Sequence, residues 1–172
     1  HLSIGQHKLN MLMSNSDSEN SINNSKQSDE DIDVCELFSI LSHLNKAIEL
    51  IEEPTKLIKL AWLNLIAGKK AKSTHEFKQA CELFENGLKM LKKIENQWKI
   101  EYELSFELYF NLACCRQYNS DYQACIKDIK SLKQFKSFLT TNHLAKTYEL
   151  CMDVCVCTGD YVKSIKNGMK AL

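Results

Sequence analysis

Three cysteines near the C-terminal end come closest, by type and spacing, to a metal site. Cys151 and Cys155 are four residues apart, so in a helix they share a face and could offer two thiolates to zinc. Cys157 points away from that face, and a fourth ligand is missing. The five histidines, at 1, 7, 43, 75 and 143, show no HExxH or paired spacing. We therefore predict no metal, and we interpret the eight cysteines as reduced, buried thiols of a cytoplasmic protein.

The Gly68-Lys69 pair invites comparison with a phosphate-binding loop. That motif needs glycine five positions earlier and Ser or Thr after the lysine, where this chain has Leu63 and Lys70. Lys69, Lys70 and Lys72 form a local basic patch, for which a solvated helix end is favoured over contact with RNA or phosphate. No Gly-x-Ser-x-Gly elbow and no kinase HRD/DFG set occurs. The sequence predicts no catalytic residue and no cofactor.

Composition favours an all-α protein. The 172 residues include one proline and five glycines, while Leu, Lys, Glu and Ala are abundant. Twenty-two basic residues balance 22 acidic ones, so we expect neither a nucleic-acid partner nor attraction to an anionic membrane. No stretch approaches the roughly 18 continuous apolar residues of a membrane span. Because the chain begins with His1 rather than Met, we expect a piece of a longer polypeptide.

Apolar periodicity divides the chain into three parts. Residues 1–13 have the pattern of the end of a truncated helix, and residues 14–30, rich in Ser, Asn, Asp and Glu, are predicted to be a disordered low-complexity insertion. Residues 31–172 are predicted to form a helical-repeat domain. It comprises a helix over 31–52, closed by Pro54, and hairpins at about 55–93, 99–135 and 140–172.

A pair formed by an aromatic residue and, three positions later, a small one recurs at the start of the second helix of each hairpin. The pairs are spaced 45 and then 39 residues apart, which indicates stacked helical hairpins rather than one compact bundle. Gly68, inside a predicted helix, indicates close approach of a neighbouring helix. The predicted packing residues are Gly68, Phe77, Ala80, Tyr122, Cys125, Tyr161 and Ser164.

Part of the chain resembles the tetratricopeptide repeat. The resemblance lies in residues 109–113 leading to Asp121-Tyr122, and in Gly159-Asp160-Tyr161. It implies a right-handed superhelix of stacked antiparallel hairpins. We expect Asp121 and Asp160 to cap their helices and Gly159 to adopt a left-handed conformation. The first hairpin has no Gly-Asp turn, and there we expect a cap at residue 73 or 74, Ser or Thr.

A longer segment of the sequence indicates a more specific family. Residues 63–74, followed by Phe77 through Leu88, resemble the helical region of very large signalling ATPases. In that family the region follows an AAA-type ATPase module, often with a Ser/Thr kinase domain before it and GAF, histidine kinase or receiver domains after it. The resemblance implies a connector in a multidomain, ATP-dependent protein kinase, and it transfers no catalytic residue.

These observations predict a non-catalytic protein-interaction or signal-relay segment. Trp98, Tyr102 and Tyr118 are candidates for contacts with a partner, which would be another protein or an adjacent domain of the same polypeptide. One alternative is a structural part of a catalytic assembly, ordering an adjacent ATPase or kinase domain in cis. A plain architectural spacer is the other.

Overall fold

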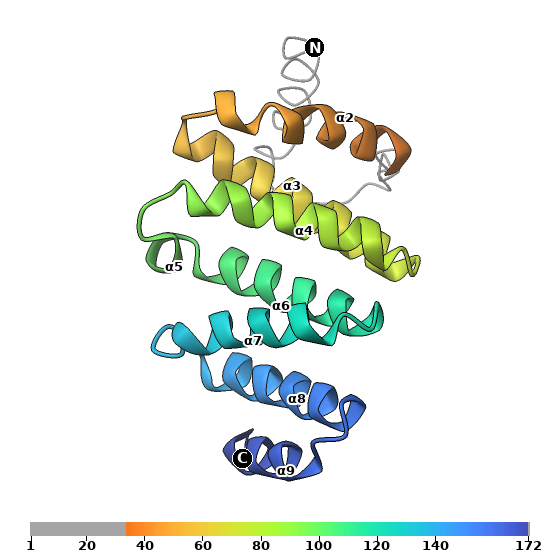
Figure 1. Ribbon diagram of the computed structural model, residues 1–172. Coiled ribbons are helices and arrows are strands. Elements are labelled where there is room, and N and C mark those ends of the chain that lie inside the picture. Colours follow the sequence, from red (N-terminus) through yellow and green to blue (C-terminus); the bar gives the residue numbers. More distant parts are fainter. Residues whose placement is uncertain (1–33, 172) are drawn as a thin grey trace, which may run out of the picture. The chain divides into compact units, whose positions relative to one another are not determined.

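The computed structural model of the chain describes residues 34–171. The helix end predicted at 1–13 and the insertion predicted at 14–30 lie outside the described residues. The chain divides between Glu52 and Glu53 into two units, each of which is described by itself. All regular elements in the described residues are helices (Figure 1), so the all-α prediction is confirmed.

The first unit contributes helix α2 (Val34–Lys46) and the 3₁₀ turn η1 (Ile48–Leu50). A continuous helix to residue 52 was the wrong prediction, because the backbone tightens after Leu44. The Ala47 amide donates to the Leu44 carbonyl at 3.0 Å and the Leu50 amide to the Ala47 carbonyl at 3.0 Å, both three residues back. The expected apolar stripe is present, since Leu41, Leu44 and Ile48 are buried.

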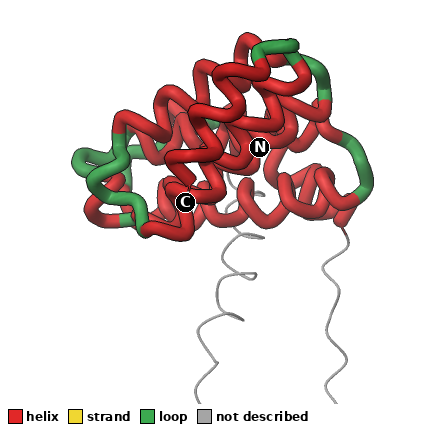
Figure 2. The backbone as a smooth tube through the Cα atoms, turned by 90° about the horizontal axis from the view of Figure 1, so that it is seen from below, coloured by secondary structure: helices red, strands yellow, loops and turns green. Residues whose placement is uncertain are grey.

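The second unit contains the three predicted hairpins, and their boundaries lie within a few residues of those expected. Figure 1 shows the helices side by side, each running back along the one before, and Figure 2 shows the connecting loops at the helix ends. A short helix before α6 was not foreseen. The helices are α3 (Pro54–Ser73), α4 (Phe77–Lys92), α5 (Gln97–Ile100), α6 (Tyr102–Tyr118), α7 (Tyr122–Gln134), α8 (Thr141–Cys157) and α9 (Tyr161–Ala171).

Each hairpin packs on the next. Helices α4 and α6 join the first hairpin to the second, and α7 and α8 join the second to the third; α6 also contacts α3 and α8. The first helices of the hairpins (α3, α6, α8) therefore form one row. We call the side formed by the other three helices, α4, α7 and α9, the second-helix face.

The same turn joins the two helices of every hairpin. A residue with positive φ lies at its centre, and the amide of the next residue donates to a carbonyl five positions back, which is the Schellman motif. The first hairpin makes this turn without a Gly-Asp pair. The central residues are His75 (64°), Ser120 (60°) and Gly159 (77°), and the bonds are Glu76 to Ala71 at 2.9 Å, Asp121 to Arg116 at 2.9 Å and Asp160 to Cys155 at 2.8 Å.

The caps differ between the hairpins. Asp121 accepts from the Ala124 amide at 3.2 Å and Asp160 from the Lys163 amide at 3.1 Å, as predicted. The cap predicted at residue 73 or 74 is wrong. Both residues finish α3, where their hydroxyls donate to α3 carbonyls at 2.6 and 3.0 Å, and α4 begins after Glu76 without a side-chain cap.

The predicted small residues lie at close helix contacts. A Cβ on Gly68 would stand 2.4 Å from Phe84 Cε1, so α3 and α4 approach too closely there for any larger residue. Ala80 and Cys125 are fully buried, and the Ser164 hydroxyl donates to the Met152 carbonyl at 3.3 Å.

The aromatic members of the pairs have different environments. Phe77 stacks on Tyr118 with ring centroids 4.8 Å apart. Tyr122 packs against the cluster that joins the second and third hairpins. Tyr161 remains exposed. The cluster comprises Ala113, Cys125, Ile129, Leu150 and Val154.

Because the three hairpins share this turn, we expect substitutions at two of its central residues to change stability in opposite directions. Ser120→Gly should raise the free energy of unfolding by about 0.5–1 kcal/mol, because a left-handed conformation costs a non-glycine residue about 1–2 kcal/mol and the added freedom of the unfolded chain offsets part of the gain. Gly159→Ala should lower it by about 1 kcal/mol through the backbone alone, since no atom lies within 4 Å of the added Cβ. Urea unfolding measures both. Shifts of the same sign would contradict the common turn.

Candidate functional site

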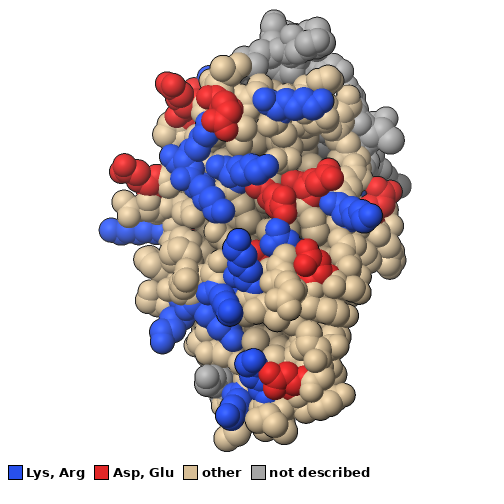
Figure 3. All heavy atoms as spheres, viewed as in Figure 1, with Lys and Arg blue, Asp and Glu red and all other residues tan. Residues whose placement is uncertain are grey.

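Two hollows open between the helices of the second-helix face. The smaller, about 260 Å³, is lined by α4, α6 and α7 and includes Leu88 and Leu112. The larger, about 450 Å³, is lined by α7, α8 and α9 and includes Ile126, Ile129 and Val154. Figure 3 looks onto this side and shows basic side chains gathered over the same helices. The rim lysines are Lys89, Lys92 and Lys127 at the smaller hollow and Lys130, Lys133, Lys163 and Lys166 at the larger.

Arg116 of α6 ties three helices together beneath the smaller hollow. One guanidinium nitrogen donates to Glu85 Oε1 on α4 and another to Asp128 Oδ2 on α7, both at 2.6 Å. Burial raises the pKa of the Asp128 carboxyl, and the neighbouring Arg116 opposes that shift only in part. The charges here hold α4, α6 and α7 in place.

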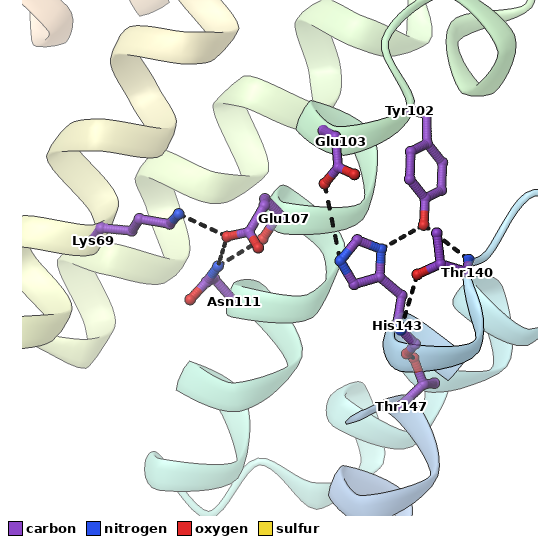
Figure 4. A network of polar contacts seen from close by, with 8 residues as sticks. All are labelled: Lys69, Tyr102, Glu103, Glu107, Asn111, Thr140, His143 and Thr147. Carbon is purple, nitrogen blue, oxygen red and sulfur yellow. Dashed lines mark hydrogen bonds and ion pairs between the residues drawn. The ribbon is translucent and has the colours of Figure 1, made fainter. Parts of the chain in front are cut away.

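A second polar network joins the first helices of the hairpins (Figure 4). Lys69 of α3 forms an ion pair with Glu107 of α6 at 2.7 Å, and Asn111 donates to the same carboxylate at 3.1 Å. Lys72 donates to Asn111 Oδ1 at 3.0 Å. The predicted basic patch is therefore largely engaged with α6, and among its three side-chain amines that of Lys70 alone has no polar partner in the described part of the chain.

Tyr102, one of the three candidates for partner contact, is engaged within the fold. Its hydroxyl contacts His143 Nδ1 and accepts from the Thr140 amide at 3.1 Å (Figure 4). Phe106 stacks on the His143 ring at 3.8 Å between centroids, and Glu103 lies 3.9 Å from Nε2. This cluster fixes the start of α8 on α6.

Trp98 and Tyr118 lie in opposite environments. Trp98 is only 4% exposed and stacks on Phe135 at 4.5 Å and on Tyr109 at 5.7 Å, so its ring fills the core instead of lining a groove. A surface contact for Trp98 was the wrong expectation. Tyr118 is exposed and lines an open hollow of about 580 Å³ with Phe77 and Lys72. Of the three candidates, it is the one whose ring is available.

The seven cysteines whose side chains are described are free thiols. Burial raises the pKa of Cys114, and it raises that of Cys125 to about 12. Cys81 differs, because hydrogen bonding with Cys115 lowers its pKa and the nearby Arg116 acts in the same direction. Within residues 34–171, no cluster of His, Cys, Asp or Glu could hold a metal ion.

Helix α9 carries an exposed apolar stripe. Tyr161, Val162, Ile165 and Met169 are 64%, 66%, 66% and 74% exposed, and their spacing places them along one side of the helix. The other side packs on α8 through buried Ser164 and Asn167. We call the four exposed residues the α9 stripe.

Sequence reasoning missed Arg116, Asp128 and His143. Each lies in a helix that contributes to the core, where a single charged or imidazole side chain among apolar residues is the only local sign. Their partners are 12 to 41 residues away in sequence, so no spacing rule connects them.

No protein family model, curated protein or solved structure matches the chain. None of the helices described in residues 34–171 has the length and apolar character needed to cross a membrane.

Arg116→Met tests whether this residue neutralises a buried carboxylate. At pH 7 the free energy of unfolding should fall by about 2–4 kcal/mol, because Asp128 would remain charged without its partner. The pKa of folded Asp128 is already raised and would rise further, so lowering the pH protonates the carboxyl and shrinks the loss. Arg116→Met with Asp128→Asn is the control and should regain most of the stability. A loss that is independent of pH, or a double variant no better than the single one, would contradict this role.

Proposed function

We propose that the chain is a non-catalytic protein-interaction segment that receives an amphipathic helix on the α9 stripe. The exposed stripe is the observation that carries the proposal. Contiguous apolar patches rimmed by polar residues are typical of protein-interaction sites on soluble proteins. A helix placed there would extend the row of helices in the way that α8 covers α7.

The stripe is more apolar in α9 than the matching positions are in α4 and α7. When the second helices are aligned on their aromatic residues, Lys78 of α4 and Gln123 of α7 stand where α9 has Val162. Glu85 and Lys130 stand where α9 has Met169. Helix α9 is thus more apolar on this side than its counterparts, which supports a function for the difference beyond the packing of one repeat.

Charge favours a partner helix with acidic flanks over a second copy of α9. On the surface of α9, Lys166 lies beside the stripe and Lys163 lies beside Lys166, farther from the stripe. The only described acidic residue next to these lysines is Asp160, which forms an ion pair with Lys163 at 3.0 Å. Two copies of α9 meeting through their stripes would bring lysines together. A helix with an apolar stripe and acidic neighbours would instead bury apolar surface and pair these charges.

The partner can be another protein or an adjacent domain of the same polypeptide. The tetratricopeptide-like superhelix and the placement in a cytoplasmic signalling ATPase or kinase rest on the sequence resemblance, and we propose them on that ground. In such a polypeptide the α9 stripe would relay a change in a neighbouring domain by docking it or releasing it.

Photo-crosslinking tests the proposal directly. Benzoylphenylalanine would replace Val162 or Met169 in the full-length protein in its own cells, with Gln123 on α7 as the exposed control position. We expect both α9 positions to crosslink to one amphipathic helix at sites about two turns apart, because the two residues lie seven positions apart on α9. Mass spectrometry identifies the helix and whether it belongs to the same polypeptide. Crosslinks scattered over many proteins, or no more frequent than at Gln123, would overturn the proposal.

A further inference from the structure

We infer that the two hollows of the second-helix face bind an acidic, extended segment of a partner protein that carries apolar side chains about three residues apart. This site does not include the four residues of the α9 stripe, although Lys163 and Lys166 of α9 line the larger hollow and lie near the stripe, and it does not rest on the function proposed above. It lies on the basic surface that Figure 3 shows over α4, α7 and α9.

The charge at the hollows is unbalanced. The three acidic residues that line them are all engaged, Glu85 and Asp128 with Arg116 and Asp160 with Lys163, and the lining lysines outnumber them. Several rim lysines, by contrast, form neither an ion pair nor a side-chain hydrogen bond within the described residues. Concave surfaces lined by one sign of charge concentrate the electrostatic field and attract ligands of opposite charge. The unpaired rim lysines are Lys92, Lys127, Lys130 and Lys166.

The interior of the larger hollow is suited to an apolar side chain. Ile126, Ile129 and Val154 line it below the lysine rim, and its volume of about 450 Å³ falls within the range of ligand pockets. Lys133 is fixed at its edge, because the amine donates to Cys151 Sγ at 3.3 Å and lies over the Tyr148 ring at 4.6 Å. The hollow therefore combines an apolar interior with a cationic rim.

The spacing of the ligand follows from α7, which borders both hollows. A helix is about 10 Å wide with its side chains, and an extended chain in the polyproline-II conformation advances about 3.1 Å per residue with three residues per turn, so its side chains at i and i+3 lie on the same face. A peptide crossing α7 would place apolar side chains in both hollows when they are about three residues apart. Carboxylates between and beside them would meet Lys127 and Lys130 of α7.

A protein segment fits this surface better than a nucleic acid or a membrane does. Proteins that bind single-stranded nucleic acid combine a basic groove with exposed aromatic rings on which bases stack. Tyr109, the aromatic residue that lines the smaller hollow, is buried against Trp98. A flat bilayer surface would bridge the two concave hollows without entering them.

The test uses a fluorescent hexapeptide with two leucines three positions apart among four carboxylates. We expect it to bind the chain in an anisotropy titration, and we expect added salt to weaken binding. Lys127→Glu with Lys130→Glu should weaken binding at least about tenfold. Lys59→Glu with Lys146→Glu changes the net charge equally at exposed positions outside both hollows and should have little effect. Replacing the peptide leucines with serines should also weaken binding about tenfold.

Circular dichroism establishes that each variant is folded, and Ile165→Ser, which alters the α9 stripe without changing the charge, should leave peptide binding unchanged. A failure of the stripe and a failure of the hollows are thus distinguishable. The inference is overturned by absence of binding, by equal losses in the two lysine pairs, or by indifference to the leucines. It is also overturned when a single-stranded RNA or a vesicle containing phosphatidylserine binds more tightly than the peptide.

Discussion

Close approach of neighbouring helices is the constraint on which the rest of this structure depends. At Gly68 the space that a side chain would need is occupied by the Phe84 ring, and a Cβ on Gly87 would stand 2.8 Å from Leu108. The first contact joins α3 to α4 and the second joins α4 to α6. The missing side chains let the first hairpin close and the second hairpin stack on it, and the contacts from α6 to α7, α7 to α8 and α8 to α9 continue the stack.

Polar side chains mainly serve this stacking. Arg116 connects α4, α6 and α7, the pair of Lys69 and Glu107 connects α3 to α6, and the Tyr102 hydroxyl connects α6 to α8. Two features of the described surface that this stacking does not use are the rim lysines of the second-helix face and the α9 stripe. Both are suited to contact with another polypeptide, one through charge and concave shape and the other through an apolar helix face.

The helices and their order could be predicted from the sequence, because the apolar periodicity and the Asp-containing turns are local signals. The geometry of the first turn could not, since His75 adopts the left-handed conformation that local rules reserve for glycine, held there by the closing bond from Glu76 to Ala71. The role of Trp98 was also beyond local rules. Its burial depends on Phe135, which lies 37 residues later and returns at the end of α7. The hollows depend on three helices at once, so no single segment indicates them.

Hydrogen exchange of α9 tests the central claim most directly. The measurement compares the isolated chain with the full-length protein purified from its own cells under gentle conditions. The account predicts that the amides of Tyr161–Ala171 exchange much more slowly in the full-length protein. The amides of α3 and α6 should change little, because both helices already pack on other helices of the chain. Equal exchange of α9 in the two samples would contradict the claim that its apolar stripe is covered by a partner helix.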